Sequence, residues 1–432
     1  MTILILTVGG SHQPLLTAIQ SVKPDRVVFL CSDDLGRRKG SYRQVTGRGK
    51  VLKSHPGLKR RDLANLVTLA GMAEGSYEVV KIGNFDDLEE CFVQADGVIE
   101  RMRAAYPGAR LLADYSGGTK CMTAGLALAA LEDERCEVNL VAGARVQFSG
   151  RMLDRIQFAR PAQVGEIRAR KLLHQVGLSL GRYDYSGAAA LLEAINRRPL
   201  GETLHRALPV AISACHAFDA WDRLAYGEAR QLLTPYRQHF VDHYLVLEAL
   251  CLDSPLDRYL KVEEILLGAE RRAAQGRYDD SLARLYRALE MIAQIRLGTY
   301  GIDTASVDLS RVPEGERAGL GSQRAVDGKV VLNLFSAWTL LEALGDAALS
   351  NWFRQRKDQV KDFLIVRNQS ILAHGTTPID VAVYRSQGER TIELCREALG
   401  RIPRSQRGPW RPLQFPTGID ALGLGTMGRL SD

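Results

Sequence analysis

The sequence lacks the signatures of several large protein classes. Its seven cysteines are scattered and include no C-x-x-C pair, which disfavours a disulfide framework or structural zinc and favours a reducing, cytoplasmic compartment. No apolar run approaches the roughly 18 residues that span a membrane, and the N-terminal stretch lacks the basic start of a secretory signal. No G-x-G-x-x-G follows a predicted strand, and no G-x-x-x-x-G-K-[ST] occurs, which disfavours a dinucleotide cofactor and a P-loop NTPase.

Metal-binding patterns are also scarce. His239 and His243 lie four residues apart, but Phe240 takes the place of the glutamate that completes an H-E-x-x-H site. The helical half shows no clear carboxylate cluster followed by E-x-K, the pattern of a metal-dependent nuclease. We therefore expect neither a metal ion nor a cofactor.

The composition is that of an ordinary globular protein with a basic balance. Hydrophobic residues make up 46% and charged residues 25% of the 432 residues, a length that predicts two or three domains. The net charge is +7 and the pI about 9.0. Ten Arg or Lys residues and no acid lie between Arg37 and Arg61. Such a segment is either an electrostatic contact for phosphates or a solvated mobile loop.

The order of apolar runs predicts an α/β half followed by a helical half. Short, nearly continuous apolar runs alternate with helical patterns at first, which indicates a Rossmann-like, doubly wound parallel sheet. The expected strands are Ile3–Val8, Val27–Cys31, Tyr77–Ile82, Leu111–Tyr115 and Val138–Ala142. From about Arg151 the apolar residues recur with the period of helices, including a long helix expected over Ala347–Leu372. We expect domains at 1–150, 151–260 and 261–432, the last ending in an irregular tail from about residue 401.

Two glycine-bearing turns each follow a predicted strand and start a helix. Glycine lets a ligand approach the backbone, and a helix N-terminus offers N–H groups and a positive dipole end to an anion. In the common doubly wound order, strands one and four are neighbours at the switch point, so the two turns should face each other. Alternatively, the glycines only shape the turns. The predicted anion-binding residues are Thr7, Gly9, Gly10, Ser11, Ser116, Gly117, Gly118, Thr119 and Lys120.

A polar pair stands near the end of the long predicted helix. Arg367 and His374 are seven residues apart, so a continuous helix would place them on one face about 10 Å apart along its axis, beside Asn368. Gly375 would then end the helix. Arginine binds phosphate through two N–H groups and histidine moves protons near neutral pH, a combination suited to metal-free RNA cleavage by a ribose 2′-OH. Alternatively, the pair is structural, with the histidine favourably placed at a helix C-terminus.

These motifs resemble the CARF–HEPN ribonucleases of type III CRISPR systems, in order along nearly the whole chain. The segments Thr7–Ser11 and Asp114–Lys120 are similar to CARF ligand loops, and Arg367–His374 is similar to the HEPN R-x(4–6)-H signature, here with six intervening residues. The segment Gly276–Glu290 resembles the first HEPN helix. The resemblance implies a CARF-like nucleotide-sensing domain at 1–150, a helical linker domain at 151–260 and a HEPN-like ribonuclease domain at 261–432.

The resemblance further implies a homodimer that binds a cyclic oligoadenylate of four or six adenylates and is activated by it. A composite HEPN site on the dimer axis would then cut single-stranded RNA without a metal ion, leaving 2′,3′-cyclic phosphate and 5′-OH ends. His374 would manage the 2′-OH proton or position the ribose, Arg367 would stabilise charge on the phosphate, and Asn368 would order the pair. Two alternatives stay open: a non-catalytic sensor of cyclic oligonucleotides, and a ring nuclease that degrades the cyclic oligoadenylate in the CARF domain.

Overall fold

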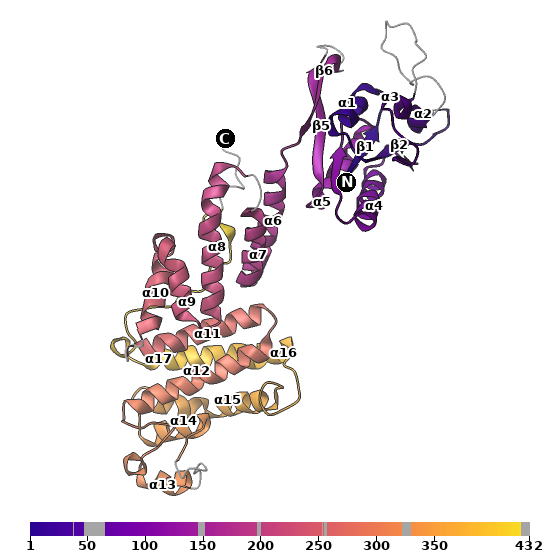
Figure 1. The fold of residues 1–432 in the computed structure, drawn as a ribbon. Helices are drawn as coiled ribbons and strands as arrows, with labels where there is room; N and C mark the ends of the chain where they lie inside the picture. Colours follow the sequence, from indigo (N-terminus) through magenta and orange to yellow (C-terminus); the bar gives the residue numbers. More distant parts are fainter. Residues whose placement is uncertain are drawn as a thin grey trace. The chain divides into compact units, whose positions relative to one another are not determined.

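The chain folds into two compact units, Met1–Arg168 and Ala169–Asp432. The computed structural model describes residues 1–37, 39–46, 65–145, 152–196, 200–252, 254, 257–321 and 330–424. Within these ranges the named strands all belong to the first unit, and the second unit is built from helices (Figure 1).

The first unit is built on a six-stranded sheet with the order β3-β2-β1-β4-β5-β6. The strands are β1 (Thr2–Val8), β2 (Arg26–Ser32), β3 (Tyr77–Ile82), β4 (Arg110–Asp114), β5 (Glu137–Arg145) and β6 (Met152–Pro161). The first five pair in parallel, and β6 runs antiparallel to β5. The pattern of apolar runs does not predict β6. A strand at the sheet edge tolerates charged residues, and β6 contains several of them.

Helices cover both faces of this sheet. Helices α1 (Gln13–Val22), α2 (Tyr42–Thr46) and α3 (Leu66–Leu69) share a core with one face. Helices α4 (Leu88–Ala105) and α5 (Lys120–Glu132) share a core with the other. Since both faces are covered, β1 is buried along almost its whole length. The expected doubly wound α/β fold is confirmed, with a mostly parallel sheet that ends in one antiparallel strand.

The second unit contains two helical cores. The first core joins α6 (Gly165–Leu180), α7 (Tyr185–Asn196), α8 (Glu202–Asp222), α9 (Tyr226–Leu233) and α10 (Val241–Leu252). The second core joins α11 (Arg258–Ala274), α12 (Tyr278–Gly298), α14 (Leu334–Ala343), α15 (Ser350–Gln369) and α17 (Glu389–Arg401). Between α15 and α17 lie the short α16 (Val381–Val383) and a π-helical turn at Tyr384–Gly388.

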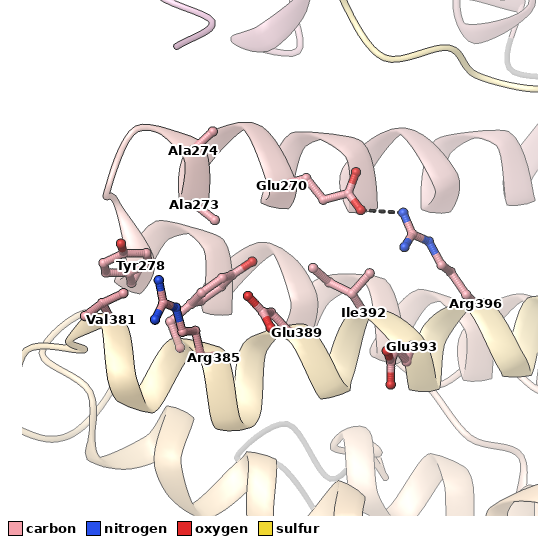
Figure 2. A pocket seen from close by; sticks show the side chains of 11 residues that line it. Glu270, Ala273, Ala274, Tyr278, Val381, Arg385, Glu389, Ile392, Glu393 and Arg396 are labelled. Carbon is pink, nitrogen blue, oxygen red and sulfur yellow. Dashed lines mark hydrogen bonds and ion pairs between the residues drawn. The ribbon is translucent and has the colours of Figure 1, made fainter. Parts of the chain in front are cut away.

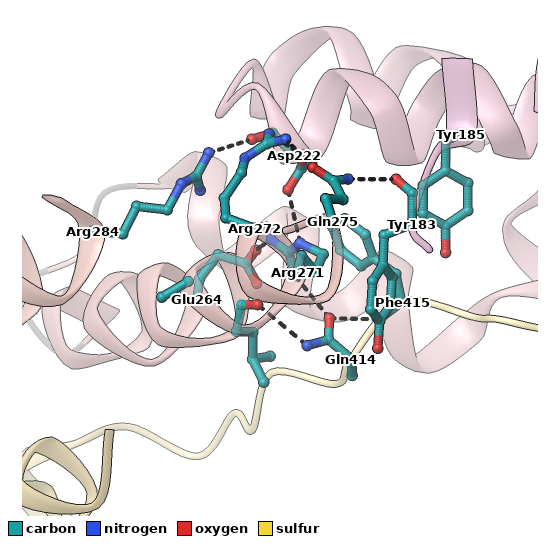
Figure 3. Close-up of polar contacts among 12 residues, drawn as sticks. Tyr183, Tyr185, Asp222, Glu264, Arg271, Arg272, Gln275, Arg284, Gln414 and Phe415 are labelled. Carbon is teal, nitrogen blue, oxygen red and sulfur yellow. Dashed lines mark hydrogen bonds and ion pairs between the residues drawn. The ribbon is translucent and has the colours of Figure 1, made fainter. Parts of the chain in front are cut away.

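A buried ionic network joins the two helical cores (Figure 3). Arg271 on α11 is fully buried, and its guanidinium pairs with Asp222 on α8 at 2.8 Å and with Glu264 at 2.6 Å. The same guanidinium lies over the ring of Phe415, 3.8 Å from its centroid. Because an unpaired buried charge is far more costly than a paired one, these contacts hold α8 and α11 in one arrangement.

The C-terminal tail packs on the first helical core as far as residue 424. It has little regular secondary structure, as expected. However, Phe415 and Leu422 are 2% and 1% exposed and belong to that core. The hydroxyl of Tyr185 on α7 donates a hydrogen bond to the carbonyl of Pro416. The tail is therefore a structural part of the helical unit.

Candidate functional site

The two glycine turns are in direct contact at the carboxyl edge of the sheet. Their strands, β1 and β4, are hydrogen-bonded neighbours. Thr7 donates its hydroxyl to the carbonyl of Gly117 at 2.5 Å. A Cβ added to Gly9 would lie 2.5 Å from the amide nitrogen of Gly118, closer than real side chains approach. The two backbones can therefore meet only because glycine stands there, and the prediction that the turns face each other is confirmed.

Three predicted ligand hydroxyls form hydrogen bonds within the protein. The Oγ of Ser116 accepts a hydrogen bond from the backbone N–H of Val141 at 2.6 Å. Thr119 caps the N-terminus of α5 through its hydroxyl, which also donates to the carbonyl of Phe85 at 2.6 Å. Thr7 is fully buried. These side chains shape the site from within, and their contact with a ligand stays a prediction.

The exposed part of the predicted site is smaller. Gly10, Ser11 and Lys120 are exposed. Lys120 is the first residue of α5, and Ser11 shortly precedes α1. Both helices start at this edge of the sheet, so their first backbone N–H groups point toward it. Among the predicted residues, the edge thus offers an anion backbone donors, the hydroxyl of Ser11 and the cation of Lys120.

Asp114 and Gln44 support the two turns. Asp114, the last residue of β4, is buried and accepts a hydrogen bond from the amide of Ser116 at 3.0 Å. Burial raises the pKa of this carboxyl above its ordinary value. Gln44 on α2 donates from its side-chain amide to the carbonyl of Gly9 at 2.5 Å. No sequence pattern indicates Gln44, because the contact depends on how the chain after β2 returns to the first turn.

Most of the basic segment predicted over 37–61 lies outside the described residues. Near its start, Arg43 pairs with Asp34 at 2.6 Å. Close by, Lys81 on β3 pairs with Asp33 at 3.1 Å. Hydrogen bonds from Arg43 hold the pKa of the Asp34 carboxyl well below its ordinary value. These acids therefore neutralise part of the positive charge at this end of the sheet.

The prediction of a long helix over 347–372 is wrong at its C-terminal end. Helix α15 ends at Gln369, and Ser370 takes an extended conformation with ψ of 152°. His374 therefore lies in a turn beyond the helix, and it does not share a helical face with Arg367. The physical reason lies in the turn that follows: Ser370 is buried and forms a β-bridge with Thr377. The periodicity of the apolar residues does not predict this pairing.

The turn over residues 370–377 folds back on the end of α15. The amide of His374 donates to the carbonyl of Asn368 at 3.3 Å. A Cβ added to Gly375 would lie 1.9 Å from the carbonyl oxygen of Gln369. Gly375 therefore permits a close backbone approach inside the turn, and the prediction that it ends the helix is wrong.

This turn brings the three predicted catalytic residues to one end of α15. Arg367 donates to the Oδ1 of Asn368 at 3.1 Å, and the backbone of Asn368 holds that of His374. Asn368 and His374 are exposed, whereas Arg367 is half-buried. The guanidinium of Arg367 lies over the ring of Tyr286 on α12, 4.3 Å from the ring centroid. The backbone contact thus keeps His374 beside Asn368 and Arg367, at a surface where Asn368 and His374 are exposed.

A groove of about 440 Å³ lies elsewhere in the second unit, between α11 and the segment from α16 to α17 (Figure 2). Glu270 on α11 and Arg396 on α17 form an ion pair across it. The charged residues of its lining are three acids and two bases: Glu270, Glu389, Glu393, Arg385 and Arg396. This acidic balance is poorly suited to RNA phosphates, which favours the end of α15 as the reacting site.

Comparison with known proteins bears directly on this site. Residues 257–397, which include Arg367, Asn368 and His374, match the family model described as the Csm6 HEPN domain. A relative described as the CRISPR system endoribonuclease Csm6 of Thermus thermophilus is 27% identical over 381 residues, covering 79% of this chain and 78% of that protein. The chain is thus similar to the CARF–HEPN ribonucleases of the Csm type.

A solved structure shares the fold of this chain over nearly its whole length. Enterococcus italicus Csm6 bound to cyclic hexa-2′-fluoro-hexa-dAMP has a TM-score of 0.58 and 14% sequence identity, covering 94% of this chain and 95% of that one. The recognition from sequence motifs is confirmed. The contacts that the individual residues make with ligand and RNA stay predictions.

The described residues contain neither a membrane-spanning helix nor a group of metal ligands. No helix among the residues that the structure describes is long and apolar enough to cross a membrane. Within the same ranges, no three or more His, Cys, Asp or Glu side chains group as metal ligands.

The Nε2 of His243 lies 3.3 Å from the carbonyl of Gln414, and burial lowers the pKa of its imidazole.

Proposed function

We propose that this chain is an endoribonuclease that cleaves single-stranded RNA in type III CRISPR antiviral defence and is activated by a cyclic oligoadenylate. The observation that carries the proposal is the group of Arg367, Asn368 and His374 at the accessible end of α15, inside the range that matches the Csm6 HEPN domain. The curated relative is itself described as an endoribonuclease. We place the activity in the cytoplasm, in keeping with cysteines that are all free thiols.

In the proposed reaction, a ribose 2′-OH attacks the neighbouring phosphorus, and the bond from phosphorus to the 5′ oxygen of the next nucleotide breaks. His374 takes the 2′-OH proton or holds the ribose, and Arg367 stabilises the negative charge that develops on the phosphate. The Oδ1 of Asn368 orders the guanidinium. The leaving oxygen takes up a proton, so the products are a 2′,3′-cyclic phosphate and a 5′-OH, and these steps use no metal ion.

We further propose that two copies of the chain build one composite active site. Each copy supplies one Arg–His set, and a two-fold axis near this surface would bring two sets together. Large apolar side chains that are close to the set in sequence are also accessible: Ile365, Ile371 and Leu372 are 53 to 56% exposed. A dimer contact there would remove these side chains from water.

The cyclic oligoadenylate is proposed to bind at the glycine turns of the first unit. The backbone N–H groups, Ser11 and Lys120 suit its phosphates, and a ring with internal two-fold symmetry suits identical turns from two copies. The solved structure with the same fold is bound to a cyclic ligand built from six nucleotides. Cyclic hexa-adenylate is therefore the first ring to test, and cyclic tetra-adenylate is the alternative.

The test is cleavage of single-stranded RNA in EDTA with cyclic hexa-adenylate, cyclic tetra-adenylate or no ring, for the wild type and for His374→Ala. We expect RNA cleavage that requires one of the two cyclic oligoadenylates, persists in EDTA and is lost in His374→Ala. RNA with a 2′-deoxyribose at the cleaved nucleotide should resist. Binding of a ring without RNA cleavage would favour the non-catalytic sensor, and degradation of the ring alone would favour the ring nuclease.

A further inference from the structure

One side of helix α12 contacts both parts of the Arg–His segment. The guanidinium of Arg367 lies over the ring of Tyr286, with Cζ 4.3 Å from the ring centroid. Seven residues earlier on α12, a carboxylate oxygen of Asp279 accepts a hydrogen bond from the backbone N–H of Ile379 at 3.0 Å. Seven residues are close to two helical turns, so Tyr286 and Asp279 lie on the same side of α12. That side therefore contacts Arg367 and also the chain that leaves the His374 turn.

The ring of Tyr286 is placed to hold a guanidinium in one orientation. An aromatic face attracts a cation that lies over it, and Tyr286 is itself half-buried. Tyr286 contacts the guanidinium on one side, which leaves its other side open to a ligand. Nη1 donates to Asn368, and the remaining N–H groups can receive a phosphate. An arginine without this support would have to be ordered during the reaction, which raises the barrier.

Asp279 fixes the far end of the turn that carries His374. Ile379 is 9% exposed and belongs to the second helical core, so its amide marks the point where the turn rejoins the packed protein. The hydrogen bond to Asp279 ties this point to α12. At the near end, the carbonyl of Asn368 accepts from the amide of His374. The backbone of His374 is thus held between two anchored points.

We infer that Tyr286 and Asp279 are positioning residues for RNA cleavage: Tyr286 orients Arg367, and Asp279 sets the turn that carries His374. The inference rests on the proposed ribonuclease function. Both residues act through another residue, and the orientation of a charge or a proton acceptor matters most in the transition state. Their loss should therefore lower kcat and leave KM for RNA nearly unchanged.

The role of Tyr286 is tested by comparing Tyr286→Leu with Tyr286→Phe in ring-activated RNA cleavage. Leucine keeps apolar bulk and helix propensity but has no ring, so kcat should fall about 3- to 30-fold with KM within about 2-fold. Phenylalanine keeps the ring face and should stay within about 2-fold of the wild type. A leucine variant with wild-type kcat, or a phenylalanine variant as impaired as the leucine variant, would overturn this role.

The role of Asp279 is tested by comparing Asp279→Ala with Asp279→Asn, since asparagine keeps an oxygen that can accept from Ile379. Asp280→Ala, the next residue in the same first turn of α12, controls for the loss of a negative charge near the helix N-terminus. We expect alanine at 279 to lower kcat about 2- to 10-fold, with asparagine and the control close to wild type. Equal losses in Asp279→Ala and Asp280→Ala would contradict the anchoring of the turn.

Wild type and His374→Ala, assayed in the same series, separate two kinds of failure. RNA cleavage by the wild type with unaffected Tyr286→Leu and Asp279→Ala variants would refute the positioning roles alone. A wild type that cleaves no RNA with either ring would refute the ribonuclease proposal and the positioning roles with it. Thermal unfolding of each variant provides the last check, since losses of kcat that simply follow losses of melting temperature would also overturn the inference.

Discussion

Replacing Gly375 by alanine tests whether the tight turn after α15 is needed for cleavage. A Cβ at this position would lie 1.9 Å from the carbonyl oxygen of Gln369 and 2.3 Å from its carbonyl carbon. These are backbone atoms at the end of a helix, so no side chain can rotate away. To restore the 3.0 Å that real Cβ atoms keep, the turn must widen by 3.0 minus 1.9, or about 1.1 Å.

Widening of this size breaks the hydrogen bonds that close the turn. The amides of Gly375 and Thr377 donate to the carbonyls of Ser370 and Gln369 at 3.2 and 3.3 Å. At about 0.5–1.5 kcal/mol each, loss of both disfavours the closed turn by about 1–3 kcal/mol. With 1.36 kcal/mol for each factor of ten, kcat should fall by about 5- to 150-fold.

The assay is single-turnover RNA cleavage with saturating cyclic oligoadenylate, with a thermal melt of the same sample. Gly400→Ala on α17 is the matched control, because nothing lies within 4 Å of a Cβ added there. It should leave cleavage unchanged and raise the melting temperature slightly, since alanine favours helix. Wild-type cleavage by Gly375→Ala would refute the reasoning, because the closed turn would then be unnecessary for the reaction.

Three further predictions concern the helical unit. Arg271→Met leaves the buried carboxylate of Glu264 without its arginine partner and removes one of the two arginines that pair with Asp222, so it should lower the free energy of unfolding by about 3–5 kcal/mol in urea, whereas Arg206→Ala removes an exposed pair and should change it little. Phe415→Ala should destabilise by about 3–5 kcal/mol, because its ring is 2% exposed; an equal effect of Leu413→Ala, at 40% exposed, would contradict the docked tail. Burial lowers the pKa of His243 from its ordinary value of 6.5, so the unfolded chain takes up this proton more readily than the folded chain as the pH falls; between pH 7.5 and 5.5 the wild type should lose stability that His243→Gln retains, and equal pH dependence would contradict this.

The central strands could be predicted from sequence because their burial on both faces requires a continuous run of apolar residues. A strand covered on both faces must be apolar along its length, and β1 shows this clearly. Strand β6 lies at the sheet edge and exposes Phe158 at 54%, so its residues need not form an apolar run. The docking of Phe415 is also hidden, because it depends on partners far away in sequence, such as Tyr185 on α7.

The residue types at the Arg–His segment could be predicted, but their geometry could not. A spacing of seven between Arg367 and His374 suits a helix as well as a helix followed by a turn. The turn is selected by the pairing of Ser370 with Thr377 inside it and by the bond from Ile379 to α12; the second is a tertiary contact. For the same reason, no local signal indicates Tyr286 as the partner of Arg367.

Weaker binding of the cyclic oligoadenylate means different things for buried and for exposed residues of the glycine turns. Thr7→Ala removes a buried hydroxyl that bonds the carbonyl of Gly117, so weaker ring binding is expected even where the ligand never touches Thr7. Lys120→Ala removes an exposed cation, so weaker ring binding at an unchanged melting temperature, measured by calorimetry, would indicate direct contact. If Lys120→Ala bound the ring like the wild type, the anion site would depend on the backbone N–H groups at the starts of α1 and α5, because those donors remain when the charge is gone.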